Sequence, residues 1–143
     1  MMSIKVIYWS ATGNTEAMAE AVAQGIQAAG KEAELIRVGD ASVDALKDEA
    51  VFALGCPAMG AEVLEEEEME PFVAELEAHV KGKTIALFGS YGWGDGEWMR
   101  DWTARMQNAG AVVLNGEGLT YQDAPDAEGL AACEALGRKL AEV

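Results

Sequence analysis

Runs of consecutive apolar residues alternate along this chain with segments in which apolar residues recur every three or four positions. The runs are typical of strands covered on both faces of a sheet, and the spaced segments are typical of helices that pack on it. We predict strands at residues 4–9, 33–38, 49–56, 83–89 and 111–114, the last interrupted at residues 116–118 and resumed at residues 119–121.

The spaced segments predict four helices. One ends near Gly30, one covers residues 71–79, one ends at Gly110 and the last begins near Pro125 and Asp126. Glycine often follows the last helical residue because it adopts a left-handed conformation without strain. Three of the helices are defined by apolar stripes, which are Met18, Val22 and Ile26; Trp98, Trp102 and Met106; and Leu130, Cys133, Leu136 and Leu140.

Strands that alternate with helices indicate one α/β domain over residues 1–143. We expect a doubly wound, five-stranded, mostly parallel sheet with helices on both faces. Unusual loops follow the first, third and fourth strands, and the carboxyl ends of parallel strands share the edge where ligands bind. These loops can converge only if their strands are neighbours, which the strand order 2-1-3-4-5 provides.

The loop after the first strand is suited to an anion. It connects the first strand to the first helix and carries Ser10, Thr12, Gly13, Asn14 and Thr15. The first N–H groups of a helix are unpaired and lie at the positive end of its dipole, so they attract phosphate. The loop has no lysine or arginine, and neither GxxxxGK nor, after the first strand, GxGxxG occurs. A phosphate held by neutral donors is therefore expected, rather than a nucleoside triphosphate or a dinucleotide.

The loops after the third and fourth strands offer contacts suited to a flat ring. Met59 precedes Gly60, which places a polarisable thioether beside a peptide with wide conformational freedom. Trp93 lies between Gly92 and Gly94, outside any helical or strand periodicity. An indole in such a loop is suited to stacking. An aromatic ring on one side and a thioether on the other suit a planar ring.

Several kinds of catalytic site are excluded by the residues at the strand ends. Cys56 cannot be a nucleophile of the Cx5R phosphatase type, because position 62 is glutamate. A phosphoacceptor receiver would need aspartates after the first and third strands, and this chain has none there. The one histidine, His79, falls at a predicted helix end remote from the loops. We expect no catalytic residue, no metal site and no disulfide framework.

Acidic residues outnumber basic residues by 25 to 10, which gives a formal net charge of −15. This charge disfavours nucleic acid and anionic membranes as partners, and it serves either solubility or encounters with basic proteins. The amino-terminal run lacks the features of a signal peptide, and no stretch approaches the roughly 20 apolar residues that span a bilayer. We expect a cytoplasmic protein.

Three long motifs resemble those of the flavodoxins, specifically the short-chain clostridial type. YWSATGNTEAMAE resembles the family's phosphate loop, GCPAMGAEVLEE its second flavin loop and LFGSYGWGDGEWMRDW its third. The resemblance extends over essentially the whole chain. Ten residues separate Leu114 from Pro125, so the insertion that splits the fifth strand of long-chain flavodoxins has no room here.

The resemblance implies a low-potential carrier of single electrons with tightly bound, non-covalent FMN in oxidised, neutral semiquinone and anionic hydroquinone states. It implies that Met59 and Trp93 flank the isoalloxazine, that Glu62 accepts from the pyrimidine N3–H, and that the Met59–Gly60 peptide turns over on reduction so that its carbonyl accepts from protonated N5. The residues expected to bind FMN are Ser10, Ala11, Thr12, Gly13, Asn14, Thr15, Pro57, Ala58, Met59, Gly60, Glu62, Ser90, Tyr91, Gly92 and Trp93.

Two other functions stay open beside the carrier. One is an FMN-dependent quinone or NAD(P)H reductase on the same fold, and the other is a binding module without cofactor. The chain is minimal, and an indole at position 93 would cover one face of the ring, so we favour the carrier over an enzyme.

Eight acids and no bases occur within residues 62–77, directly after the second loop. We expect these charges to tune the potential and to steer basic-surfaced reductases and oxidoreductases into transient complexes with a monomeric carrier.

Overall fold

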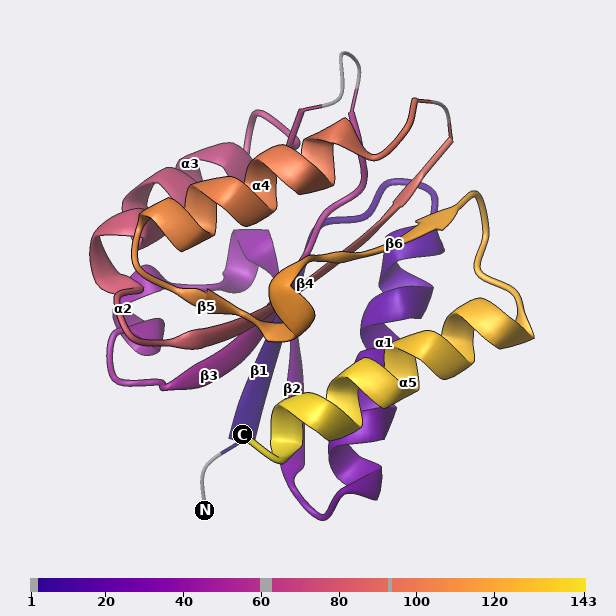
Figure 1. The fold of residues 1–143 in the computed structure, drawn as a ribbon, viewed down its shortest axis with the longest axis horizontal. Coiled ribbons are helices and arrows are strands. Elements are labelled where there is room, and N and C mark those ends of the chain that lie inside the picture. Colours follow the sequence, from indigo (N-terminus) through magenta and orange to yellow (C-terminus); the bar gives the residue numbers. More distant parts are fainter. Residues whose placement is uncertain (1–2, 60–62, 93) are drawn as a thin grey trace.

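A parallel β-sheet runs through the centre of the computed structural model, which describes residues 3–59, 63–92 and 94–143. Within these ranges the strand order is β2-β1-β3-β4-β5, with β6 also paired to β4 (Figure 1). The predicted α/β class and the order 2-1-3-4-5 are confirmed, and every pair is parallel. The strands are β1 Ser3–Tyr8, β2 Glu32–Arg37, β3 Val51–Gly55, β4 Thr84–Tyr91, β5 Val112–Val113 and β6 Leu119–Gln122.

The edge beyond β4 consists of two short strands instead of one. β5 pairs with the first half of β4 and β6 with the second half. Between them lies a 3₁₀ turn, Leu114–Gly116, in which Asn115 has a φ of 67°. A left-handed backbone cannot continue a ladder of strand hydrogen bonds. The interruption expected at residues 116–118 therefore begins slightly earlier and divides the predicted fifth strand.

Helices cover both faces of the sheet, α1 and α5 on one and α2, α3 and α4 on the other (Figure 1). The helix expected over residues 71–79 begins earlier and ends at Leu76, where a 3₁₀ turn, Glu77–His79, follows. Neither α2 nor the 3₁₀ turn Val38–Asp40 was expected, because such short segments show no periodicity. The helices are α1 Asn14–Ala28, α2 Val43–Leu46, α3 Met69–Leu76, α4 Glu97–Asn108 and α5 Ala127–Ala141.

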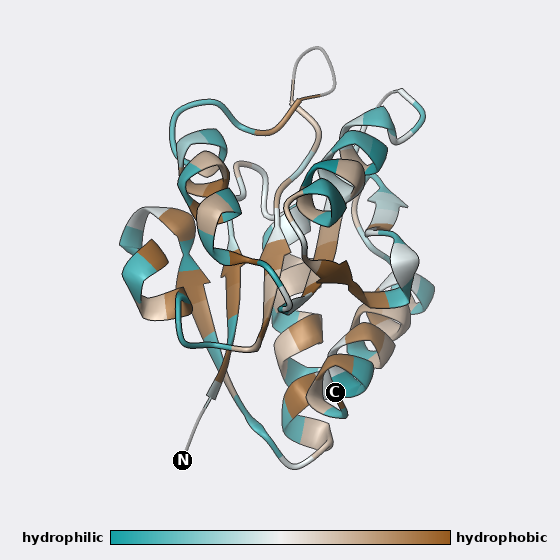
Figure 2. Ribbon diagram, turned by 60° about the vertical axis from the view of Figure 1, so that its left-hand side comes forward, coloured by the Kyte–Doolittle hydropathy of each residue, from teal (hydrophilic) through white to brown (hydrophobic). Residues whose placement is uncertain are grey.

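Successive residues of the central strands face opposite layers of the core. On β3, Phe52 and Leu54 pack in the layer of α2, α3 and α4, whereas Ala53 packs in the layer of α1 and α5. Figure 2 shows hydrophobic colour concentrated on the strands and hydrophilic colour on much of the helices. Trp98 and Trp102 are each 1% exposed, which confirms the apolar stripe predicted for α4. In the described part of the chain, no helix is long and apolar enough to cross a membrane.

Glycines let α1 and α5 approach each other backbone to backbone. A Cβ added to Gly25 of α1 would lie 2.0 Å from the carbonyl oxygen of Glu134 in α5, and a Cβ on Gly137 of α5 would lie 2.0 Å from the carbonyl oxygen of Val22 in α1. Any larger side chain at either position would push the helices apart. The contact therefore sets the distance between α1 and α5.

Candidate functional site

Four loops at the carboxyl ends of β1, β3, β4 and β6 surround a cavity of about 310 Å³. Three of them are the loops expected to converge. Of the other predicted residues, Gly13 directly precedes α1, while Gly60, Glu62 and Trp93 lie outside the described residues. The cavity is lined by Ser10, Ala11, Thr12, Asn14, Thr15, Pro57, Ala58, Met59, Ser90, Tyr91, Gly92 and Asp123.

The start of α1 presents free donors at one end of this cavity. Gly13 has a φ of 97°, and within the described ranges the amides of Asn14 and Thr15 have no hydrogen-bond acceptor. Ser10 Oγ accepts from the N–H of Gly13 at 3.1 Å and from the N–H of Glu16 at 3.3 Å. A hydroxyl has two acceptor lone pairs and one proton. Both lone pairs of Ser10 are used by the backbone, so its proton is left for a ligand oxygen.

A buried pair of hydroxyls joins α1 to β4 beside these donors. Thr15 Oγ1 and Ser90 Oγ lie 3.0 Å apart, and the N–H of Ser90 donates to Thr15 Oγ1 at 3.3 Å. Thr15 is 1% exposed and Ser90 is 5% exposed. Whichever hydroxyl donates within the pair, the other keeps its proton for a third oxygen. This end of the cavity thus offers neutral donors.

The second loop is fastened both to β4 and to itself. The N–H of Ala58 donates to the carbonyl of Ser90 at 3.0 Å. Met59 and Val63 exchange two backbone hydrogen bonds, of 2.9 and 3.1 Å. The backbone of Met59 is therefore held on the cavity side, where its thioether can contact a flat ring.

A buried carboxylate fixes the point where the second loop enters α3. Glu65 is 6% exposed, and its oxygens accept the N–H groups of Glu67, Glu68 and Met69 at 2.7–2.9 Å. Burial alone would raise the pKa of this carboxyl group, but the three backbone donors outweigh burial and the pKa is lowered. The sequence analysis groups Glu65 with the neighbouring acids that tune the potential and steer partners, whereas in the structure its carboxylate holds the turn that leads into α3.

Asp123 lines the cavity although the sequence analysis did not single it out. It has a φ of 60°, and its N–H donates to the carbonyl of Tyr91 at 2.7 Å. This bond holds the loop after β6 against the loop after β4. The sequence could have indicated Asp123, because the turn before Pro125 follows a strand that ends at the same edge of the sheet.

Neither cysteine is placed to act as a nucleophile. Cys56 and Cys133 have no exposed surface, and burial raises the pKa of each thiol to about 12. They lie in core layers on opposite faces of the sheet, so they cannot pair with each other. His79 lies in the turn that leads to the amino end of β4, away from the cavity at the carboxyl ends.

A larger hollow, of about 490 Å³, lies between α4 and residues 116–120. It shares no lining residue with the cavity at the loops. None of the predicted site residues that the structure describes borders it. We therefore assign the candidate site to the smaller cavity.

Comparisons with known proteins agree with this architecture. The sequence model of the family described as Flavodoxin matches residues 6–137. Flavodoxin of Clostridium beijerinckii is 50% identical over 140 residues, which cover 98% of this chain and 100% of the relative. Flavodoxin of Megasphaera elsdenii is 49% identical over 111 residues, which cover 78% of this chain and 81% of the relative. The solution structure of two-electron reduced Megasphaera elsdenii flavodoxin has a TM-score of 0.87 at 42% identity, covering 98% of this chain and 99% of its own. The chain therefore belongs to the flavodoxin family and is an FMN-binding electron carrier, not an enzyme.

Proposed function

We propose that the cavity at the loops holds the FMN of this carrier, with the phosphate at the start of α1 and the ring between the second and third loops. One observation carries the proposal: motif residues that are far apart in the chain line a single cavity at the carboxyl edge of the sheet. Bound FMN supplies the chemistry, which is the reversible uptake of single electrons. The chain supplies binding, orientation and shielding from water.

The donors at the start of α1 fit a phosphate. Ser10 has one hydroxyl proton to give, the pair of Thr15 and Ser90 has another, and the amides of Asn14 and Thr15 add two N–H groups. Exposed Thr12 adds a further hydroxyl to the lining. Helix N–H groups stabilise an anion through both hydrogen bonds and the helix dipole. A phosphate can therefore be held here without a lysine.

Small and apolar residues at the other end fit a flat ring. Ala58, Met59 and Gly92 line the cavity between the second and third loops. The roles of Gly60, Glu62 and Trp93 rest on the resemblance of their motifs to the flavodoxin loops. We assign Glu62 to the pyrimidine edge of the ring and Trp93 to the ring face opposite Met59.

Exposed acids after the second loop support partners with basic surfaces. Glu66 and Glu67 are exposed, whereas the carboxylate of Glu65 holds the turn before α3 and Glu70 pairs with Arg105 at 2.6 Å. The exposed charges can raise the encounter rate with basic redox proteins without forming a permanent interface. Such complexes would be transient, as electron exchange requires.

We also propose that the protein works as a cytoplasmic monomer made of one domain over residues 1–143. Two free cysteines buried in separate core layers are suited to a reducing compartment. The family match over residues 6–137 supports a single domain.

A redox titration of the purified protein, followed by its absorbance spectrum, tests the proposed function. A carrier is expected to release FMN in equimolar amount on denaturation and to take up electrons in two separated one-electron steps. A single two-electron step, or rapid reduction by NADPH with no reductase added, would contradict the carrier and support a reductase. A colourless protein that takes up no FMN would contradict both.

A further inference from the structure

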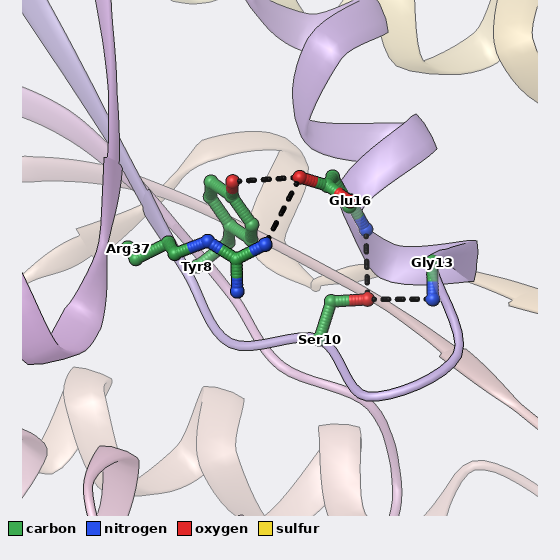
Figure 3. A network of polar contacts seen from close by, with 5 residues as sticks. All are labelled: Tyr8, Ser10, Gly13, Glu16 and Arg37. Carbon is green, nitrogen blue, oxygen red and sulfur yellow. Dashed lines mark hydrogen bonds and ion pairs between the residues drawn. The ribbon is translucent and has the colours of Figure 1, made fainter.

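A network of polar contacts lies beside the phosphate loop (Figure 3). Glu16 accepts hydrogen bonds at Oε2 from the hydroxyl of Tyr8 at 3.1 Å and from Nη2 of Arg37 at 3.4 Å. The guanidinium carbon of Arg37 lies 5.8 Å from the centre of the Tyr8 ring. The network therefore connects β1, β2 and α1 at the carboxyl edge of the sheet.

The register of the strands brings these residues together and links them to the phosphate loop. Tyr8 and Arg37 are paired neighbours at the ends of β1 and β2. Glu16 lies in the first turn of α1, and its N–H donates to Ser10 Oγ. Ser10 and Arg37 also line a common hollow of about 440 Å³. Glu16 thus contacts Ser10 through its backbone and Arg37 through its side chain.

The charge of Glu16 works against a phosphate at this place. Its carboxylate lies in the same helical turn whose amides are proposed to meet the phosphate, and two anions at one helix end repel each other. Arg37 is the cation that the network brings to this carboxylate. The side chain of Glu16 is 37% exposed and that of Arg37 is 59% exposed, so water and salt weaken the interaction without removing it.

We propose that Arg37 is a positioning residue for FMN binding. Its guanidinium neutralises the charge of Glu16 at the phosphate end of α1, so that this carboxylate can hold Tyr8 without repelling the phosphate. The inference rests on the proposed function, because it takes the start of α1 as the phosphate site. Tyr8 fixes the carboxylate from the other side. Burial and the hydrogen bond to Glu16 raise the pKa of Tyr8, so its hydroxyl keeps the proton that it donates.

The test compares FMN with riboflavin, which has the same ring and no phosphate. Full-length protein loaded with either flavin is diluted, and the released flavin is measured by fluorescence. Arg37→Gln is expected to weaken FMN binding about three- to tenfold, which corresponds to about 0.7–1.4 kcal/mol, with riboflavin binding unchanged. Added salt is expected to reduce the loss, because it screens the exposed charges.

Three further variants separate charge from structure. Arg37→Lys keeps the charge and is expected to bind FMN like the wild type. Glu16→Gln combined with Arg37→Gln removes both charges and is expected to restore FMN affinity to within about twofold, since no carboxylate is then left uncompensated. Lys47→Gln is the matched control, because Lys47 pairs with Asp44 at 2.7 Å near the amino end of β3 and its loss changes the net charge equally.

The inference is overturned if Arg37→Gln binds FMN as the wild type does, if riboflavin binding falls equally, or if Lys47→Gln weakens FMN binding as much. It is also overturned if Arg37→Lys loses as much as Arg37→Gln, or if the double variant stays weak. A wild-type protein that binds FMN no better than riboflavin gives a different result, because it contradicts the phosphate site and with it the proposed function.

Discussion

The indole N–H of Trp98 donates a hydrogen bond to the backbone carbonyl of Cys56, 3.1 Å away. The bond joins α4 to the point where β3 becomes the second loop, across 42 positions of sequence. Trp102, one turn further along α4, is just as buried, yet the residues that the structure describes offer its indole N–H no acceptor. Two equally buried tryptophans on one helix therefore differ in a single hydrogen bond.

Substituting phenylalanine at each position isolates the contribution of that hydrogen bond to the free energy of unfolding. Trp98→Phe and Trp102→Phe remove similar volumes, but only Trp98→Phe leaves the buried carbonyl of Cys56 without its donor. We expect Trp98→Phe to lower the free energy of unfolding by about 1–3 kcal/mol more than Trp102→Phe. Urea denaturation of both variants at the same excess of FMN measures the difference. Equal losses would show that the bond adds nothing to stability.

The hydrogen bonds that the Glu65 carboxylate accepts in the turn before α3 predict a pH-dependent contribution to stability. Glu65→Gln removes the charge that three backbone N–H groups stabilise and is expected to cost about 1–2 kcal/mol at neutral pH. The pKa of Glu65 is lower in the folded protein than its ordinary value of 4.5. The stabilisation is therefore fully present above pH 4.5 and is lost as the pH falls through the lower, folded-state pKa.

Denaturation of wild type and Glu65→Gln at neutral and acidic pH measures this effect. The gap between the two proteins is expected to close on acidification. Glu66→Gln is the control, because Glu66 is exposed and carries the same charge. A gap that does not change with pH, or an equal loss in the control, would contradict this role of Glu65.

Ser10 is expected to discriminate FMN from riboflavin. Ser10→Ala removes the hydroxyl that accepts from Gly13 and Glu16 and is proposed to donate to the phosphate. We expect FMN affinity to fall about tenfold or more, equivalent to about 1.4 kcal/mol, with a much smaller change for riboflavin. Ser3→Ala, at the opposite end of β1, is the control. Equal losses for both flavins would place the phosphate elsewhere.

Both thiols are expected to be inert in the native protein. The pKa of Cys56 and that of Cys133 are raised to about 12 by burial, and the thiolate is the reactive form. DTNB at pH 8 should therefore label neither residue until denaturant is added, after which both should react. Rapid labelling of either thiol in the folded protein would show that its core layer opens.

The exposed acids after the second loop are expected to act on encounter rates. Glu66→Gln with Glu67→Gln should lower the rate of electron transfer to a basic cytochrome at low salt by about two- to fivefold and weaken its salt dependence. The midpoint potential for reduction to the anionic hydroquinone should rise slightly, because fewer negative charges then oppose this anion. Glu32→Gln with Glu142→Gln is the control, because it removes the same number of negative charges at other exposed positions. An equal effect in that control would point to net charge instead of steering.

The strand order and the three converging loops could be predicted because both depend on local patterns. Apolar runs mark strands, and polar or glycine-rich loops after them mark the carboxyl edge where Ser10, Met59 and Ser90 meet. Contacts between distant segments leave no such pattern. Nothing in the spacing of acids distinguishes Glu65, which holds the turn before α3, from exposed Glu66. Nothing in β2 reveals that Arg37 reaches Glu16.

The glycine contact between α1 and α5 fixes α1 at a point far from its first turn. Gly25 lies roughly 16 Å along the helix from Asn14, at about 1.5 Å of rise per residue. A methyl group added at Gly25 would force the two helices apart there, and any tilt of α1 that results would displace the first-turn amides at the proposed phosphate site. The direction in which the first-turn N–H groups of α1 point thus depends on the other end of the helix, where the contact requires a residue that has no side chain.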